Sequence, residues 1–122
     1  MLRFLLGSSL LFALGCSDLP KHRPLPPGVT FSGTWDSNWG QITLTQRGAR
    51  VSGQYKGFRN GSLSGESKGS LFTFKWTQVE NRQHGRGYLQ MTPDGMRLEG
   101  AWGYGTETSG GGRWWANRVA EP

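Results

Sequence analysis

The sequence predicts an all-β protein: a single small eight-stranded antiparallel up-and-down barrel after a signal peptide and a proline-rich tether. Three observations predict it. Apolar and polar residues alternate with a period of two through most of the chain after Thr30. Glycine, asparagine and proline turns interrupt this alternation at short intervals, and no stretch of helical length shows a 3.6-residue period. The length of 122 residues leaves room for one domain.

The chain opens with a secretory signal pattern, predicted over residues 1–15. Arg3 provides a basic start, an apolar stretch follows over 4–14, and Gly15 precedes Cys16, the only cysteine. An apolar stretch of about eleven residues is too short to span a bilayer, which needs roughly 20. A basic start, a short apolar stretch and a small residue at its end are typical of a cleaved signal peptide.

The stretch Phe12-Ala13-Leu14-Gly15-Cys16 resembles the lipobox of bacterial lipoproteins, although Ala13 stands where that family most often has leucine. The resemblance implies cleavage before Cys16 and acyl chains such as palmitate on that cysteine, which would anchor the protein to a membrane. A buried thiol in an ordinary apolar helix is the alternative. With Cys16 acylated, no cysteine remains for a disulfide or for thiol chemistry. Ser17 follows Cys16, and by the same resemblance it indicates the outer membrane (periplasmic or surface face) rather than the inner membrane.

Residues 16–29 are predicted to form a lipidated, proline-rich tether. Prolines at positions 20, 24, 26 and 27 exclude a helix and favour an extended, semi-rigid chain. Two interpretations remain for Lys21, His22 and Arg23, which are contact with anionic lipid and a merely solvated linker.

Eight strands are predicted within a barrel domain of residues 30–119, which a tail of residues 120–122 follows. Alternation places Phe31 with Trp35, Ile42 with Leu44, and Phe74 with Trp76 on one face of their strands. Short connections favour pairing between neighbours in sequence, and closure of eight strands removes exposed edges. The predicted strands cover 30–36, 40–46, 50–57, 61–66, 70–78, 85–92, 96–104 and 112–119.

An internal repeat of the form apolar-x-Gly-x-aromatic occurs at 31–35, 51–55 and 98–102. In a strand, the glycine of each repeat lies between two inward side chains and permits the close approach of a neighbour. The repeats therefore favour a strongly coiled sheet.

Gly33-Thr34-Trp35 in the first strand, with Arg118 at the end of the last, resembles the calycin pattern of lipocalins and avidins. The resemblance implies that Arg118 packs across Trp35 and closes one end of the barrel. Gly53-Gln54-Tyr55 is similar to an avidin strand that contributes a ligand-contacting tyrosine. Biotin binding does not follow from this similarity.

No catalytic constellation is recognisable. His22 and His84 are isolated, the carboxylates are dispersed, and neither a nucleophile elbow nor a phosphate-binding loop occurs. We therefore expect a protein that is not an enzyme and has no cofactor and no metal.

The chain carries 14 Lys and Arg against 8 Asp and Glu, a formal net charge of +6. Two interpretations remain for the arginines near predicted turns, a basic rim for an anionic partner or charge that keeps the domain soluble. Export to the envelope argues against nucleic acid as that partner. These arginines are Arg47, Arg50, Arg59, Arg82 and Arg86.

Six tryptophans carry the most information about function. Alternation turns Trp35, Tyr55, Trp76 and Trp102 inward, either as the wall of a ligand pocket or as the filling of a solid barrel. A filled or nearly filled barrel is favoured because the strands are short and aromatic rings are large.

We expect a membrane-anchored lipoprotein of the bacterial cell envelope that acts as a non-catalytic binding module for a small apolar or lipid-like ligand. The alternative is a solid barrel that acts as a protein-interaction or assembly module, such as an inhibitor of an envelope-directed enzyme. That module would act through loops 58–62, 80–86 and 103–112.

Overall fold

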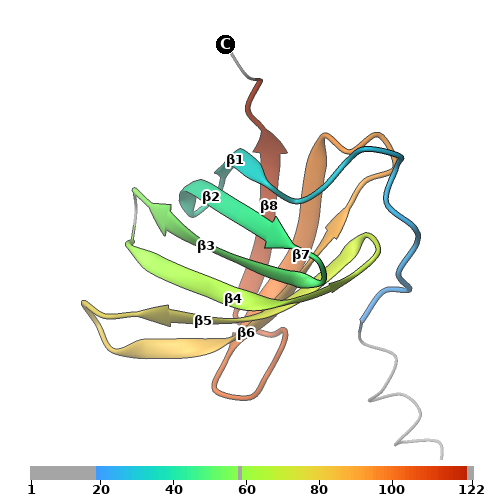
Figure 1. Ribbon diagram of the computed structural model, residues 1–122. Helices are drawn as coiled ribbons and strands as arrows, with labels where there is room; N and C mark the ends of the chain where they lie inside the picture. The colour runs from blue at the N-terminus through green and yellow to red at the C-terminus, as the bar shows by residue number, and fades with distance from the viewer. Residues whose placement is uncertain (1–18, 58, 121–122) are drawn as a thin grey trace, which may run out of the picture.

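Eight antiparallel strands form one closed barrel in the computed structural model, which describes residues 19–57 and 59–120 (Figure 1). Every strand pairs with its neighbours in sequence, and β1 pairs with β8. This confirms the predicted all-β up-and-down barrel. Cys16 and the predicted signal peptide lie outside the described residues, and the described part contains no helix that could cross a membrane. The strands are β1 (Gly33–Ser37), β2 (Gly40–Arg47), β3 (Arg50–Lys56), β4 (Gly61–Lys68), β5 (Leu71–Gln78), β6 (Gln83–Met91), β7 (Arg97–Tyr104) and β8 (Gly112–Arg118).

The prediction for the start of the first strand is wrong by three residues. The predicted strand starts at residue 30, whereas β1 starts at Gly33, which has a φ of 136°. Phe31 is fully buried ahead of the strand, and its backbone amide donates a hydrogen bond to Gln46 Oε1 at 2.8 Å. The ring of Phe31 packs against Phe72, with 5.7 Å between centroids. Burial of its ring, rather than strand pairing, therefore explains the apolar residue at position 31.

The period-two pattern matches the burial of the side chains. Trp114 is 3% exposed and faces the core, whereas the adjacent Trp115 is 37% exposed on the outer surface. Inside the barrel, apolar side chains from all eight strands form one cluster. Glycines allow the strands to coil tightly around it, because a Cβ at Gly53 would collide with the carbonyl oxygen of Thr43.

The two ends of the barrel differ. At the end that we call the closed end, the connections β2–β3, β4–β5 and β6–β7 meet the chain of residues 19–32. At the opposite end, which we call the mouth, lie the connections β1–β2, β3–β4, β5–β6 and β7–β8 (Figure 1).

The proline-rich segment is attached to the closed end from Lys21 onward. The backbone of Arg23 accepts a hydrogen bond from Ser70 N at 2.6 Å and donates one to Ser70 Oγ at 3.0 Å. The Arg23 guanidinium donates to the carbonyl oxygen of Met91 at 3.0 Å. Leu25 and Val29 pack against the core. Much of the stretch predicted as a tether is therefore part of the barrel's end.

Candidate functional site: an aromatic pocket at the mouth

Arg118 and Trp35 lie together at the closed end. The Arg118 guanidinium carbon is 4.2 Å from the centroid of the Trp35 ring. The same guanidinium donates hydrogen bonds to the carbonyl oxygens of Thr30, Ser32 and Gly95 at 2.8, 3.1 and 3.0 Å. Burial lowers the pKa of Arg118. This geometry corresponds to the end closure that the calycin resemblance implies.

Trp35, the fourth candidate ligand-lining residue, lies away from the mouth. Its indole Nε1 donates to the carbonyl oxygen of Phe31 at 3.0 Å, and Arg118 covers one face of its ring. The ring is fully buried and belongs to the closed end rather than to the pocket. Inward orientation alone does not predict which end of a barrel a side chain reaches, and the register along the strand decides that.

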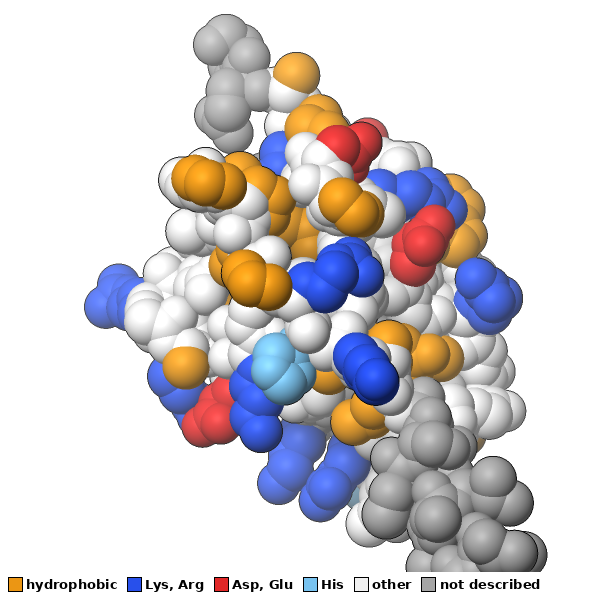
Figure 2. All heavy atoms as spheres, turned by 90° about the vertical axis from the view of Figure 1, so that its right-hand side faces the viewer, with side chains coloured by type: hydrophobic (Ala, Val, Ile, Leu, Met, Phe, Trp, Pro, Cys, Tyr) orange, Lys and Arg blue, Asp and Glu red, His pale blue; other side chains and the backbone are white. Residues whose placement is uncertain are grey.

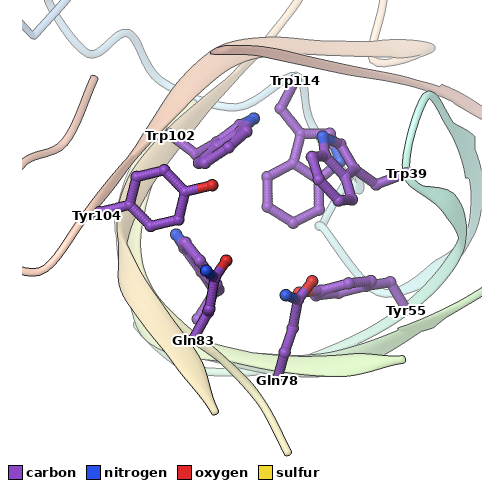
Figure 3. Close-up of a pocket in the computed structure, with 8 residues that line it drawn as sticks. Trp39, Tyr55, Gln78, Gln83, Trp102, Tyr104 and Trp114 are labelled. Atoms are coloured by element: carbon purple, nitrogen blue, oxygen red, sulfur yellow. The ribbon is translucent and has the colours of Figure 1, made fainter. Parts of the chain in front are cut away.

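A small pocket opens at the mouth, between aromatic side chains. Its cavity volume is about 20 Å³, close to the space that one water molecule needs. Figure 3 shows that Gln78 and Gln83 extend toward the centre of the opening, and that the Tyr104 hydroxyl points inward. The interior beneath is filled by the core cluster. The pocket is lined by Trp39, Tyr55, Trp76, Gln78, Gln83, Trp102, Tyr104 and Trp114.

The walls of the pocket are held by contacts between ring edges and ring faces. Trp102 is at the centre of one set, with centroids 5.3 Å from Trp39, 5.7 Å from Trp76 and 5.1 Å from Tyr104, all nearly perpendicular. Trp114 meets Tyr55 at 5.3 Å with the same geometry. Edge-to-face pairs of this kind stabilise beyond the area that they bury. The pocket therefore has a rigid aromatic wall.

Glycines make room for these rings. A Cβ at Gly111 would collide with the six-membered ring of Trp102, and a Cβ at Gly61 would collide with the phenol of Tyr55. A Cβ at Gly85 would come within 2.8 Å of Trp76 Nε1. The absence of side chains at these glycines thus allows the backbone to approach the aromatic residues of the pocket closely.

The polar groups of the pocket are uncharged. Tyr55 donates a hydrogen bond from its hydroxyl to Gln78 Oε1 at 2.8 Å, and Gln78 Nε2 donates to Asn81 Oδ1 at 3.2 Å. Burial raises the pKa of Tyr55 to about 12, so the phenol keeps its proton at neutral pH. The described lining includes no Asp, Glu, Lys or Arg. A charged group entering this pocket would lose hydration without gaining an ionic partner.

Two indole N–H groups in the lining have no hydrogen-bond partner among the described residues. They are Nε1 of Trp102 and Nε1 of Trp114, and both are buried. By contrast, Trp76 Nε1 donates to the carbonyl oxygen of Gly103 at 3.1 Å. An unpaired buried donor costs about 1–3 kcal/mol. An oxygen acceptor bound between the rings would offset that cost.

The structure brings three of the predicted lining residues together, Tyr55, Trp76 and Trp102, and adds five that the sequence interpretation missed. In β5 and β6 the alternation of inward and outward side chains continues to the strand ends, where it turns Gln78 and Gln83 inward. In β7 the same alternation turns Tyr104 inward. Continuing each alternation to its last residue would have found them. Trp39 lies in a connection, where alternation predicts nothing.

The arginines near the predicted turns are distributed over both ends and the wall of the barrel. Arg47 and Arg50 lie at the closed end, Arg59 and Arg82 lie at the mouth, and Arg86 lies within β6 on the outer surface. Proximity to a turn is insufficient to group them, because successive turns of a meander alternate between the two ends.

Among the described residues, no three His, Cys, Asp or Glu side chains lie close enough to hold a metal ion. Comparisons of the chain with known protein families, with curated proteins and with solved structures found no match.

Proposed function

We propose that this protein is a lipid-anchored lipoprotein of the bacterial envelope whose barrel is a non-catalytic binding module for a small apolar ligand. The aromatic pocket at the mouth, with its two unpartnered indole N–H groups, carries this proposal. An apolar pocket whose lining includes a few polar groups is typical of small-molecule sites. The anchor rests on the lipobox-like sequence that ends at Cys16.

The geometry narrows the ligand class. The space of about 20 Å³ in this open pocket admits one small group, and the filled interior beneath it leaves no room for an acyl chain. The uncharged lining favours a neutral group, and the indole N–H donors favour an oxygen acceptor such as a carbonyl or ether. The remainder of the ligand would lie on the rim, where Tyr104 is 51% exposed. A lipid-like ligand would therefore bind through a compact end group.

Native mass spectrometry of protein gently extracted from its own membrane tests this proposal. The intact mass reports acylation of Cys16, and a noncovalent adduct that is lost on denaturation reports the ligand. We expect Trp102→Phe to lose the adduct, because that change removes an unpartnered N–H and part of the wall. Trp115→Phe is the matched control on the outer surface and should retain it. Trp102 is preferable to Trp76, whose N–H also holds β7.

Retention of the adduct in both variants, or a bare chain in the wild type, would overturn ligand binding at the mouth. An unacylated Cys16 would overturn the anchor and leave the pocket untouched. The two parts of the proposal therefore fail separately.

A second function, a protein-interaction module, is favoured by one observation at the same mouth. The turn between β5 and β6 presents Val79 with 87% of its side chain exposed, at the same end of the barrel as the exposed Tyr104. A contiguous exposed apolar patch that included these side chains would mark a protein contact. Co-extraction of a second protein that Val79→Asp abolishes would favour this function, whereas an adduct that survives Val79→Asp would favour the small ligand.

A further inference from the structure

The positive charge of the described chain is unevenly distributed over the barrel. The strands β1, β2, β7 and β8 contain two acidic residues, Asp36 and Glu99, against the basic residues Arg47, Arg97, Arg113 and Arg118. Arg97 is paired with Glu99 at 2.9 Å, and Arg118 lies over Trp35. The strands β3–β6 contain one acidic residue, Glu66, against the basic residues Arg50, Lys56, Lys68, Lys75 and Arg86. The excess of basic over acidic residues is therefore larger on β3–β6, where it is four, than on the other four strands, where it is two.

Lys75 and Arg86 are two neighbouring basic residues on the β3–β6 side of the barrel. They are direct cross-strand partners in the β5–β6 ladder, and both side chains are exposed. His84 lies two residues before Arg86 and faces the same way. Like charges placed directly opposite each other on a sheet are destabilising. An anionic partner would remove that repulsion.

A groove on the outer surface links these residues to the start of the described chain. Its lining includes Arg50, Lys75 and Arg86, together with Leu19, whose side chain is 38% exposed. We call these three basic residues, with Glu66 between them, the basic wall. In Figure 2 Lys and Arg side chains outnumber Asp and Glu on the visible face, which includes the closed end.

The chain itself limits how far the predicted anchor can be from the basic wall. Leu19 is the third residue after Cys16, and three extended residues span at most about 11 Å. Acyl chains on Cys16 would therefore enter a membrane beside the basic wall. Leu19, an apolar residue at the edge of a basic surface, suits the interface between lipid headgroups and acyl chains.

We propose that the basic wall of β3–β6 is a docking surface for an anionic lipid bilayer, so that the barrel lies with this side on the membrane. The choice of a membrane over a soluble polyanion rests on the anchor at Cys16 of the proposed function. The mouth then opens along the membrane surface rather than into it. Each basic residue close to an anionic surface contributes about fivefold to binding.

The test uses the full 122-residue chain, translated in vitro without the acylation enzymes, so that binding depends on the protein surface. Flotation with vesicles of POPC alone and of POPC with 30% POPG measures the preference for anionic lipid. Residues 1–18 are the same in all variants, and their contribution cancels in the comparison. We expect Lys75→Gln/Arg86→Gln to lower the POPG preference roughly 25-fold, and 0.5 M salt to abolish it in the wild type.

The matched control is Arg82→Gln/Arg113→Gln, which removes the same charge near the mouth and should change the preference less than threefold. Glu66→Gln removes the acid within the basic wall and should raise the preference about fivefold. Misfolding does not explain loss of binding in Lys75→Gln/Arg86→Gln, because relief of repulsion predicts a melting temperature at or above that of the wild type.

An equal loss in both double variants, or no preference for POPG in the wild type, would overturn the proposal. Binding to soluble polyphosphate as tight as binding to POPG vesicles would overturn the membrane as the partner. None of these results depends on the mouth pocket or on the mass of Cys16, so failure here is distinguishable from failure of the proposed function.

Discussion

Arg118→Met should remove about 3 kcal/mol of the free energy of unfolding. The methionine keeps the packing of the side-chain stem and removes the guanidinium from three carbonyl oxygens and from the Trp35 ring. The hydrogen bonds to Ser32 and Gly95 are partly buried and are worth about 1 kcal/mol each, and the exposed bond to Thr30 adds little. The cation–π contact adds about 1 kcal/mol.

Urea unfolding followed by far-ultraviolet circular dichroism measures this loss by linear extrapolation. For a domain of this size, a loss of about 3 kcal/mol lowers the melting temperature by roughly 12–24 °C. Arg113→Met is the control on the same strand and should change the stability by less than about 0.5 kcal/mol. Arg118→Lys keeps the charge but not the forked donors, and should lie between the two. A loss below about 1 kcal/mol in Arg118→Met would refute the view that this arginine seals the closed end.

Three further predictions concern the pocket, the strand contacts and the attached segment. Because the pKa of Tyr55 is raised from 10.0 to about 12, the folded state holds a proton that the unfolded state releases, so stability should fall as pH rises from 10 to 12. Tyr55→Phe should lack this component in urea titrations at each pH. Gly100→Ala should cost 1–3 kcal/mol, because a Cβ there would collide with the Tyr88 carbonyl oxygen. Gly48→Ala is the control, because no atom lies within 4 Å of the new Cβ and only the positive φ of this residue causes strain. It should lower the free energy of unfolding by about 1 kcal/mol, measured by thermal unfolding. Ser70→Ala should expose residues 19–29 to limited proteolysis, since it removes the acceptor for Arg23 N and leaves the barrel intact; unchanged cleavage would show that the remaining contacts hold the segment.

Period-two alternation predicted the barrel well because each strand has one face in the core and one in water. The strand ends beyond β1 agree with prediction within about two residues, the usual uncertainty of such boundaries. Alternation places Phe31 on the same face as Trp35 and so predicts a strand there, but the backbone amide of Phe31 bonds to the side chain of Gln46 instead. The alternation of apolar and polar residues indicates the direction in which a side chain points, but it does not predict the hydrogen bonds of that residue's backbone.

The candidate site was only partly predictable, for a related reason. Tyr55, Trp76 and Trp102 were found by parity, but nothing in their local sequence distinguishes them from Trp35. The distinction depends on register, which places Trp35 beside Arg118 on β8, far away in sequence. Trp39 reaches the pocket from a connection, and its contacts with Trp102 and Trp114 form only when the barrel closes.

The pairing of β1 with β8 sets the order in which the barrel can assemble. All other pairings join consecutive strands and can form as each hairpin leaves the ribosome. The β1–β8 ladder can form only after the last strand has been made, and it is short. Its three residue pairs are Trp35 with Arg118, Asp36 with Asn117, and Ser37 with Ala116. Until then β1 and β7 present unpaired edges, which are templates for association with other chains. A nascent or truncated chain without β8 should therefore aggregate, and one short terminal strand protects the whole molecule from self-association.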